Sequence, residues 1–263
     1  MKLRLPTIIG LGLVALVVVA AIAALFAPLP VGTPFAPPDG THLLGTDQTG
    51  RDLLQAVLGG AMTTLVIAGL SALAGLLLGG AMSGLALRLC PLPDAGTIAP
   101  RQGMVAIIAG LVLAGLLGPG MANAVIAIGI SVTLGACSEL HLQLDRMRQL
   151  PYVQAARAAG LPTIATVQRH LMPELLPWIS ALALRQLAVA VLLEVALSFA
   201  GLGVTAPAMS LGSMMTGAQT LLTLQPLLAV LPGALAFGIA AALFLAAAGF
   251  SPRPGRGVNH AAV

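Results

Sequence analysis

Charged residues are scarce in this chain. Only 8% of its 263 residues are Asp, Glu, Lys or Arg, and aromatic residues make up 3%. A soluble domain carries about 25% charged residues, so this chain could not cover a surface exposed to water. Its pI of about 10.0 does not indicate nucleic-acid binding, because the aromatic stacking surface of such proteins is also missing. We expect membrane lipid around the chain and no nucleic-acid partner.

The residues needed for catalysis and for metal binding are also sparse. Lys2 is the only lysine, which excludes a P-loop with its phosphate-binding lysine. The four histidines are scattered, and no HExxH motif or Cys/His cluster with metal-ligand spacing occurs. We therefore expect no catalytic residue, no metal site and no cofactor in this chain. Cys90 and Cys137 fall near the inner membrane face, a reducing side, so no disulfide is expected.

Apolar residues make up most of the chain. Hydrophobic residues account for 58%, and the mean hydropathy is +1.02. Apolar runs of roughly 20 residues indicate membrane spans. The runs are Ile8–Phe26, Leu65–Leu87, Met104–Leu117, Met121–Ala136, Trp178–Phe199 and Leu227–Phe250. The sequence therefore predicts an all-α polytopic membrane protein with six transmembrane helices.

Two of these runs allow another interpretation. The third and fourth are short and meet at 118–120, so they form either a re-entrant hairpin or two spans with a tight outer turn. Two spans fit the charges better, because ten of the twelve Lys/Arg then lie on the inner side and only Arg51 lies in an outer loop. The first run could be a secretory signal, but its length and Pro28 favour an anchor.

This topology places both termini in the cytoplasm. Residues 1–60 form an N-terminal anchor and an extracytoplasmic loop, 61–250 the transmembrane core, and 251–263 a cytoplasmic tail. Within the core, the small-residue segments 69–84 and 233–248 pack either against a partner subunit or within this subunit.

A polar stretch, Glu139 to Pro173, interrupts the apolar runs on the inner side. Its centre, Tyr152 to Gly160, is rich in alanine and ends in glycine, which predicts a short helix with a glycine stop. A helix with small side chains allows close approach, so we expect it to dock into a groove of another protein.

Three segments carry a resemblance to a known family. Gln154-Ala-Ala-Arg-Ala-Ala-Gly160, followed by His170-Leu-Met-Pro173, resembles the EAA loop of ABC importer permeases. His42 to Asp52 resembles the LGTDxxGRD signature of dipeptide, oligopeptide and nickel permeases. Leu197 to Gly203, with Leu211 to Met214, resembles their late outer loop. The resemblance implies the transmembrane domain of a type I ABC importer.

The chain departs from the family pattern at several positions. Gln154 replaces the usual glutamate, Met172 precedes the proline, and Leu211 stands where a tryptophan is usual. The tail after Phe250 lacks the family ending. The segments Gly203–Pro207 and 225–233 resemble the nickel or metal-chelate branch more than the peptide branch.

The resemblance also implies roles for particular residues. The ATPase-coupling loop would consist of Tyr152, Gln154, Ala155, Ala156, Ala159, Gly160, His170 and Pro173. The extracytoplasmic motif would consist of Gly45, Thr46, Asp47, Gly50, Arg51 and Asp52. That motif is either a structural clasp, with Asp47 or Asp52 paired to Arg51, or a contact for a binding protein.

Arg185 and Glu194 are the ionisable residues inside the apolar runs. A charge at this depth costs roughly 2.5–3.5 kcal/mol on insertion scales, so each needs a partner or water. Nine residues of helix separate them by about 13 Å, too far for a direct pair. We expect Glu194 to act structurally at the subunit interface. For Arg185, lining the pathway is one alternative.

The resemblance implies an importer in the bacterial inner membrane. This chain would form half of the pathway for nickel, a metal chelate or di- and oligopeptides. Its partners would be a second, homologous permease, two ATP-binding subunits that hold ATP and Mg²⁺, and an extracytoplasmic substrate-binding protein. The alternatives are an ion-coupled secondary transporter, which needs carboxylates at mid-membrane, and a non-transporting scaffold.

Overall fold

The computed structural model describes residues 5–26, 32–40, 42–89, 99–151, 154, 172–218 and 226–250. In this part of the chain, regular secondary structure consists of seven α-helices and no strands. The helices are α1 (Leu5–Phe26), α2 (Leu53–Leu89), α3 (Ala99–Leu117), α4 (Met121–Arg148), α7 (Met172–Phe199), α8 (Leu211–Ala218) and α9 (Leu227–Phe250). The predicted all-α fold is confirmed.

Five of these helices are long and apolar enough to cross a membrane: α1, α2, α4, α7 and α9. The predicted third span corresponds to α3, whose apolar part, Val105–Leu117, is shorter than the others. The predicted count of six is therefore approximate. A helix is the expected form for every such segment, because the bilayer offers no hydrogen-bond partners for backbone groups.

Several helices extend beyond the predicted spans. Helix α4 continues from Ala136 to Arg148, so the first part of the predicted polar loop is helical. Its apolar face persists through Leu140 and Leu144 to Met147, which is buried. Helix α2 begins at Leu53, so the predicted division between residues 60 and 61 falls inside one continuous helix.

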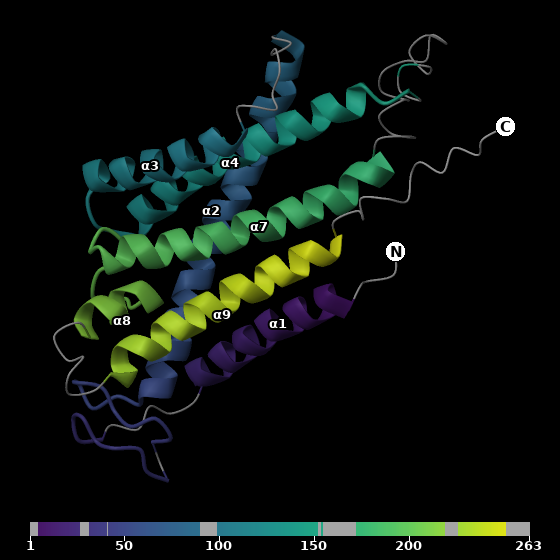
Figure 1. The fold of residues 1–263 in the computed structure, drawn as a ribbon. Coiled ribbons are helices and arrows are strands. Elements are labelled where there is room, and N and C mark those ends of the chain that lie inside the picture. Colours follow the sequence, from purple (N-terminus) through teal and green to yellow (C-terminus); the bar gives the residue numbers. More distant parts are fainter. Residues whose placement is uncertain are drawn as a thin grey trace.

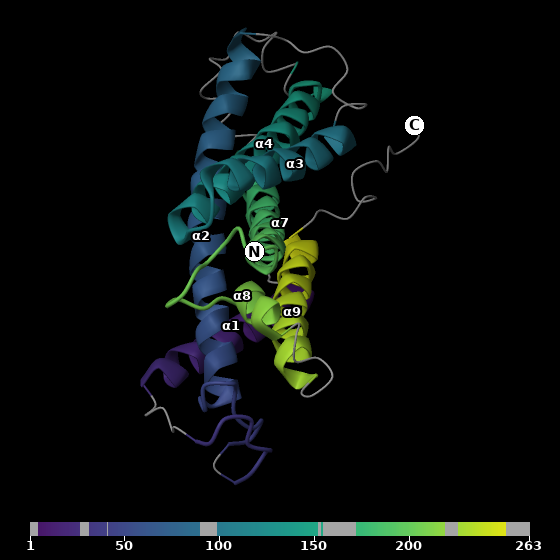
Figure 2. The same ribbon diagram turned by 90° about the vertical axis from the view of Figure 1, so that its left-hand side faces the viewer.

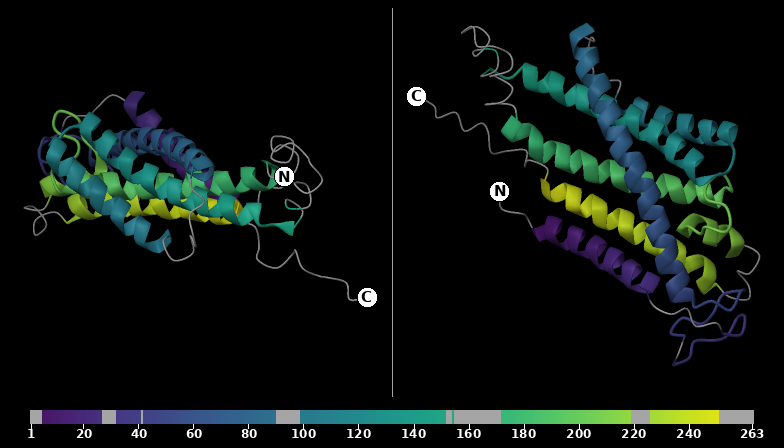
Figure 3. Two further views of the ribbon diagram at one scale, coloured as in Figure 1. Left: turned by 90° about the horizontal axis from the view of Figure 1, so that it is seen from above. Right: turned by 180° about the vertical axis from the view of Figure 1, so that it is seen from behind.

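The helices form a layer that α2 crosses. In Figure 1, α1, α9 and α7 lie side by side, and α4 and α3 continue the layer. The view from behind in Figure 3 shows α2 running obliquely across this layer, with its most extensive contacts on α4. Short helix α8 packs against α7 and α9 near the beginning of α2 (Figure 2).

Glycines permit the close crossing of α2 over α4. A Cβ atom at Gly75 would lie 2.6 Å from Val132 Cγ1, and one at Gly79 would lie 2.8 Å from the Thr133 carbonyl oxygen. At Gly69 and Gly84 an added Cβ would meet nothing within 4 Å. The glycines of the predicted small-residue segment 69–84 therefore fall into two groups: Gly75, Gly79 and Gly80 pack within this subunit, whereas Gly69 and Gly84 face open space.

Candidate functional site

The two ends of the bundle carry different groups of functional candidates. At one end lie residues 32–40, 42–52 and 200–218, here called the cap (Figure 1). At the other end, the end of α4 approaches the beginning of α7, here called the junction. The beginning of α1 and the end of α9 lie at the junction end (Figure 1).

The first half of the cap is a hydrogen-bonded loop built around Asp47. Its Oδ1 accepts hydrogen bonds from the Thr49 amide at 2.7 Å, the Thr49 hydroxyl at 2.7 Å and the Arg51 amide at 3.0 Å. Gly50 has φ 78°, and a Cβ there would collide with the Gly32 carbonyl oxygen. A glycine is required because the turn needs both a left-handed backbone and a close approach.

Asp52 joins this loop to α2. Its Oδ1 accepts the Gln55 amide at 3.0 Å, as an N-cap residue does, and its Oδ2 lies 3.2 Å from His42 Nδ1. The expectation that Arg51 pairs with Asp47 or Asp52 is wrong, because the Arg51 side chain is exposed and forms no ion pair with described residues. His42, and not Arg51, lies against Asp52, because the loop returns to the beginning of α2.

Thr46 and Gly45 complete a clasp in this half of the cap. The Thr46 hydroxyl donates to the Thr33 carbonyl at 2.6 Å and accepts from the Ala36 amide at 2.8 Å. Gly45 has φ 78°, and a Cβ there would lie 2.5 Å from the Ala36 carbonyl oxygen. The motif residues therefore hold the loop together, as the clasp interpretation expects.

The second half of the cap is anchored to Glu194. This carboxylate is completely buried inside the chain, so the expectation that Glu194 lies at the subunit interface is wrong. Its Oε1 accepts from the Ser198 hydroxyl at 2.7 Å, and the Val204 amide donates to that same hydroxyl oxygen at 3.2 Å. Its Oε2 is buried without a hydrogen-bond partner among the described residues.

Hydrogen bonds tie helix α8 to α2 and to α7. The Leu211 amide at its beginning donates to the Thr64 hydroxyl on α2 at 3.2 Å. The Thr216 hydroxyl lies 2.8 Å from the Phe199 carbonyl oxygen at the end of α7. These contacts fix the position of α8 relative to the spans.

Arg185 has a partner that the sequence analysis did not identify. Its Nη2 lies 2.8 Å from Glu139 Oε2, and Gln186 Nε2 donates to Glu139 Oε1 at 3.2 Å. The pair joins α4 to α7, with side-chain exposures of 30% for Arg185 and 41% for Glu139. The apolar periodicity that continues past Ala136 was the signal that could have placed Glu139 on a helix.

At the junction, the structure describes few of the predicted coupling residues. Tyr152, Ala155, Ala156, Ala159, Gly160 and His170 lie outside the described residues. Pro173 lies in the first turn of α7. Gln154 is exposed, its amide donates to the Leu150 carbonyl at 3.1 Å, and its side-chain Nε2 donates to the Gln149 carbonyl at 3.2 Å.

A small apolar cluster connects the two flanks of this segment. Buried Met147 packs with Leu150 and with Leu175 of α7. The residues before and after 155–171 are thus held together.

The family comparison covers the junction and most of the helices. The model of the binding-protein-dependent transport system inner membrane component matches residues 98–251, more than half of the chain. The chain belongs to this family. It is a multi-pass membrane permease of a binding-protein-dependent transport system, and the predicted family is confirmed.

Curated relatives of the permease extend the match toward the N-terminus. It is 32% identical over 216 residues to a putative peptide transport system permease protein of Brucella suis, covering 78% of this chain and 72% of the relative. A probable D,D-dipeptide transport system permease protein of Escherichia coli is 30% identical over 230 residues, covering 82% of this chain and 71% of the relative. The nickel transport system permease protein of the same species is 29% identical over 199 residues, covering 74% of this chain and 72% of the relative.

Proposed function

We propose that this permease forms half of the translocation pathway of an ATP-driven importer in the bacterial inner membrane. The family match over 98–251 is the observation that carries this proposal, because it spans α3 to α9 and includes the coupling segment. The other half of the pathway would come from a second, homologous permease. Two ATP-binding subunits would supply energy, and a separate binding protein would capture the cargo.

The junction is the proposed contact with the ATPases. The segment from Tyr152 to Pro173 carries the motif, and its flanks are joined by Met147, Leu150 and Leu175. ATPase closure would push this segment and move α4 and α7 together as a rigid unit. Gln154 offers an exposed amide for the contact, but it cannot form the ion pair available to a glutamate.

The cap is proposed to face the extracytoplasmic side and the binding protein. The distribution of Lys and Arg supports a topology with both termini and residues 139–173 in the cytoplasm. Asp39–Asp52 and Thr205–Ser213 are then outside. Their hydrogen bonds provide a preformed surface, which lowers the entropic cost of docking.

For the cargo, we propose di- or oligopeptides or nickel. Relatives of similar identity are named for peptide, D,D-dipeptide and nickel transport. The domain division proposed is an anchor and outer loop (1–60), a permease core (61–250) and a tail (251–263), with α2 bridging the first two parts.

Extraction of the native complex in mild detergent tests the proposal. We expect a different permease and ATPase subunits to copurify with this chain. Vesicles containing the complex should then take up labelled Ala-Ala or ⁶³Ni²⁺ only with ATP and the binding protein present. A monomer or homodimer that transports cargo without ATP would refute it.

A further inference from the structure

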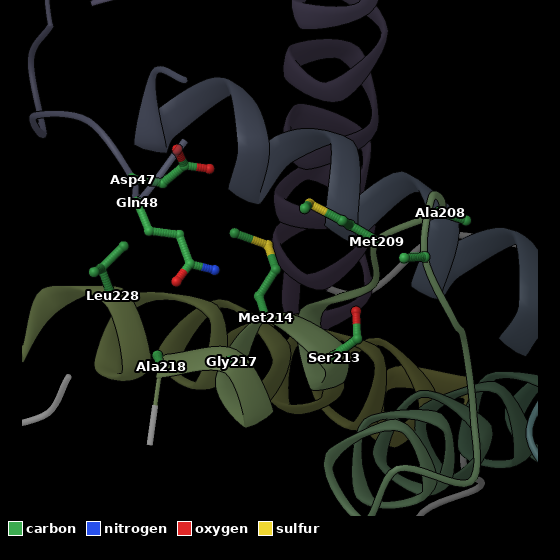
Figure 4. A pocket seen from close by; sticks show the side chains of 10 residues that line it. Asp47, Gln48, Ala208, Met209, Ser213, Met214, Gly217, Ala218 and Leu228 are labelled. Carbon is green, nitrogen blue, oxygen red and sulfur yellow. The ribbon is translucent and has the colours of Figure 1, made fainter. Parts of the chain in front are cut away.

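The cap contains a cavity of about 210 Å³ whose chemistry the proposed function does not use. It lies between the Asp47 loop, the segment before α8, and α8 itself, as Figure 4 shows. Its lining includes Asp47, Gln48, Ala208, Met209, Met214 and Gly217.

Asp47 gives this cavity a negative charge that is not neutralised by an ion pair. The residue is 8% exposed, and all three hydrogen bonds of its side chain reach Oδ1. Within the described residues, Oδ2 accepts no hydrogen bond and Arg51 forms no ion pair with it. Asp52, the other acid of the motif, is paired with His42 outside the cavity. One oxygen of Asp47 is thus bound by the fold, and the other is available to a ligand.

The remaining walls combine one amide with flexible apolar side chains. Gln48 extends from the loop toward Gly217 on α8, and Met209 and Met214 border the same space (Figure 4). Methionine is unbranched and adapts to ligands of different shape. Pockets for drug-sized ligands have volumes of roughly 300–1,000 Å³. At about 210 Å³, this cavity suits a group no larger than a single amino-acid residue.

We propose that the cavity binds the amino-terminal residue of a peptide cargo at the outer mouth of the importer. Asp47 Oδ2 accepts a charge-assisted hydrogen bond from the terminal ammonium, a group with up to three donors. Met209 and Met214 contact the first side chain without strong selection for its shape. A metal ion such as Ni²⁺ fits less well, because imidazole is its usual protein ligand and the cavity's described lining holds one carboxylate and no histidine. This inference rests on the proposed function and assigns a peptide to it.

A cysteine at Gly217 can report on the charge of the cavity. A Cβ there would meet nothing nearer than Gln48 Nε2 at 4.0 Å, so Gly217→Cys places a thiol in the cavity without a clash. In membranes containing the complete importer, cationic and anionic methanethiosulfonates of similar size are applied from outside. The importer without this substitution measures the background from Cys90 and Cys137.

The expected result is faster labelling by the cationic reagent. Asp47→Asn retains the Oδ1 acceptor but removes the charge, so it should reduce the cationic-to-anionic rate ratio about tenfold. Asp52→Asn is the matched control outside the cavity. It retains the Oδ1 acceptor for Gln55 and should leave the ratio nearly unchanged. An equal ratio before and after Asp47→Asn would overturn the assignment, as would an unreactive thiol.

Protection by a ligand tests the peptide directly. Ala-Ala should slow labelling of Gly217→Cys, whereas N-acetyl-Ala-Ala, which lacks the ammonium, should not. Equal protection by Ala-Ala and N-acetyl-Ala-Ala refutes the proposal. Protection that requires the binding protein but no peptide also refutes it. If Gly217→Cys does not reach the membrane, Ala208→Cys probes the same cavity. Labelling needs no transport, so selective protection without ATP-driven peptide uptake would overturn the proposed function while retaining this binding site.

Discussion

Gly75→Ala should destabilise the permease by opening the contact between α2 and α4. The added Cβ would lie 2.6 Å from Val132 Cγ1, 2.7 Å from Val132 Cβ and 3.0 Å from the Gly129 carbonyl oxygen. Carbon atoms in good contact are about 3.5–4.0 Å apart, so the two helices must separate by roughly 1 Å. A different Val132 rotamer does not remove the clash, because its Cβ is attached to the backbone.

The magnitude follows from two opposing effects. Overpacking in a well-packed core costs about 1–3 kcal/mol. Replacing glycine by alanine inside a helix recovers up to about 1 kcal/mol. We expect a net loss of about 1–2 kcal/mol for Gly75→Ala. Gly69→Ala is the matched control on the same helix, where the new Cβ meets nothing within 4 Å and the change should be neutral or slightly stabilising.

The assay is unfolding of the purified permease in mixed micelles with increasing SDS, followed by far-UV circular dichroism. Gly75→Ala should unfold at lower SDS than Gly69→Ala, with a difference in the free energy of unfolding of about 1–3 kcal/mol. Adding Val132→Ala should restore only part of the loss, because the clash with its Cβ remains. Equal stability of the two glycine variants would refute the packing argument.

Three further predictions concern topology, coupling and the internal ion pair. In intact cells, a membrane-impermeant thiol reagent should not label Ala158→Cys but should label Ala208→Cys. The reverse pattern would show that the chain has the opposite orientation in the membrane. Gly160→Val should uncouple ATP hydrolysis from transport while leaving the helical content unchanged, because the glycine stop and the close docking both need a residue without a side chain. Wild-type transport rates in reconstituted vesicles would disprove the coupling role. A double-mutant cycle with Glu139→Gln and Arg185→Gln should give a coupling energy of about 0.5–1 kcal/mol in the same unfolding assay, the size typical of polar pairs between membrane helices. Strictly additive effects would show that the pair contributes nothing.

The sequence by itself was sufficient for the class of protein and for its helices. Apolar runs of span length can satisfy their backbone groups in lipid only as helices or as a closed barrel, so composition and run length together predicted the all-α fold. The motif residues also placed the chain in its family, because the segments 42–52, 154–173 and 197–214 resemble the family's motifs and occur in the family's order. The limits of α4 were harder to predict, because polar residues such as Glu139 interrupt a helix face that remains apolar as far as Met147.

Only the tertiary structure decided which groups meet. Arg185 and Glu139 are 46 residues apart, and the amide of Leu211 meets the hydroxyl of Thr64 across 147 residues. Such pairs depend on where helices cross and how each is rotated about its axis, which a pattern of side chains along one helix does not specify. For the same reason, the sequence could not show that Glu194 is buried within the subunit, or that Gly75 faces α4 while Gly69 faces open space. The free oxygen of Asp47 likewise became apparent only when the loop, the segment before α8 and α8 were brought together around one cavity.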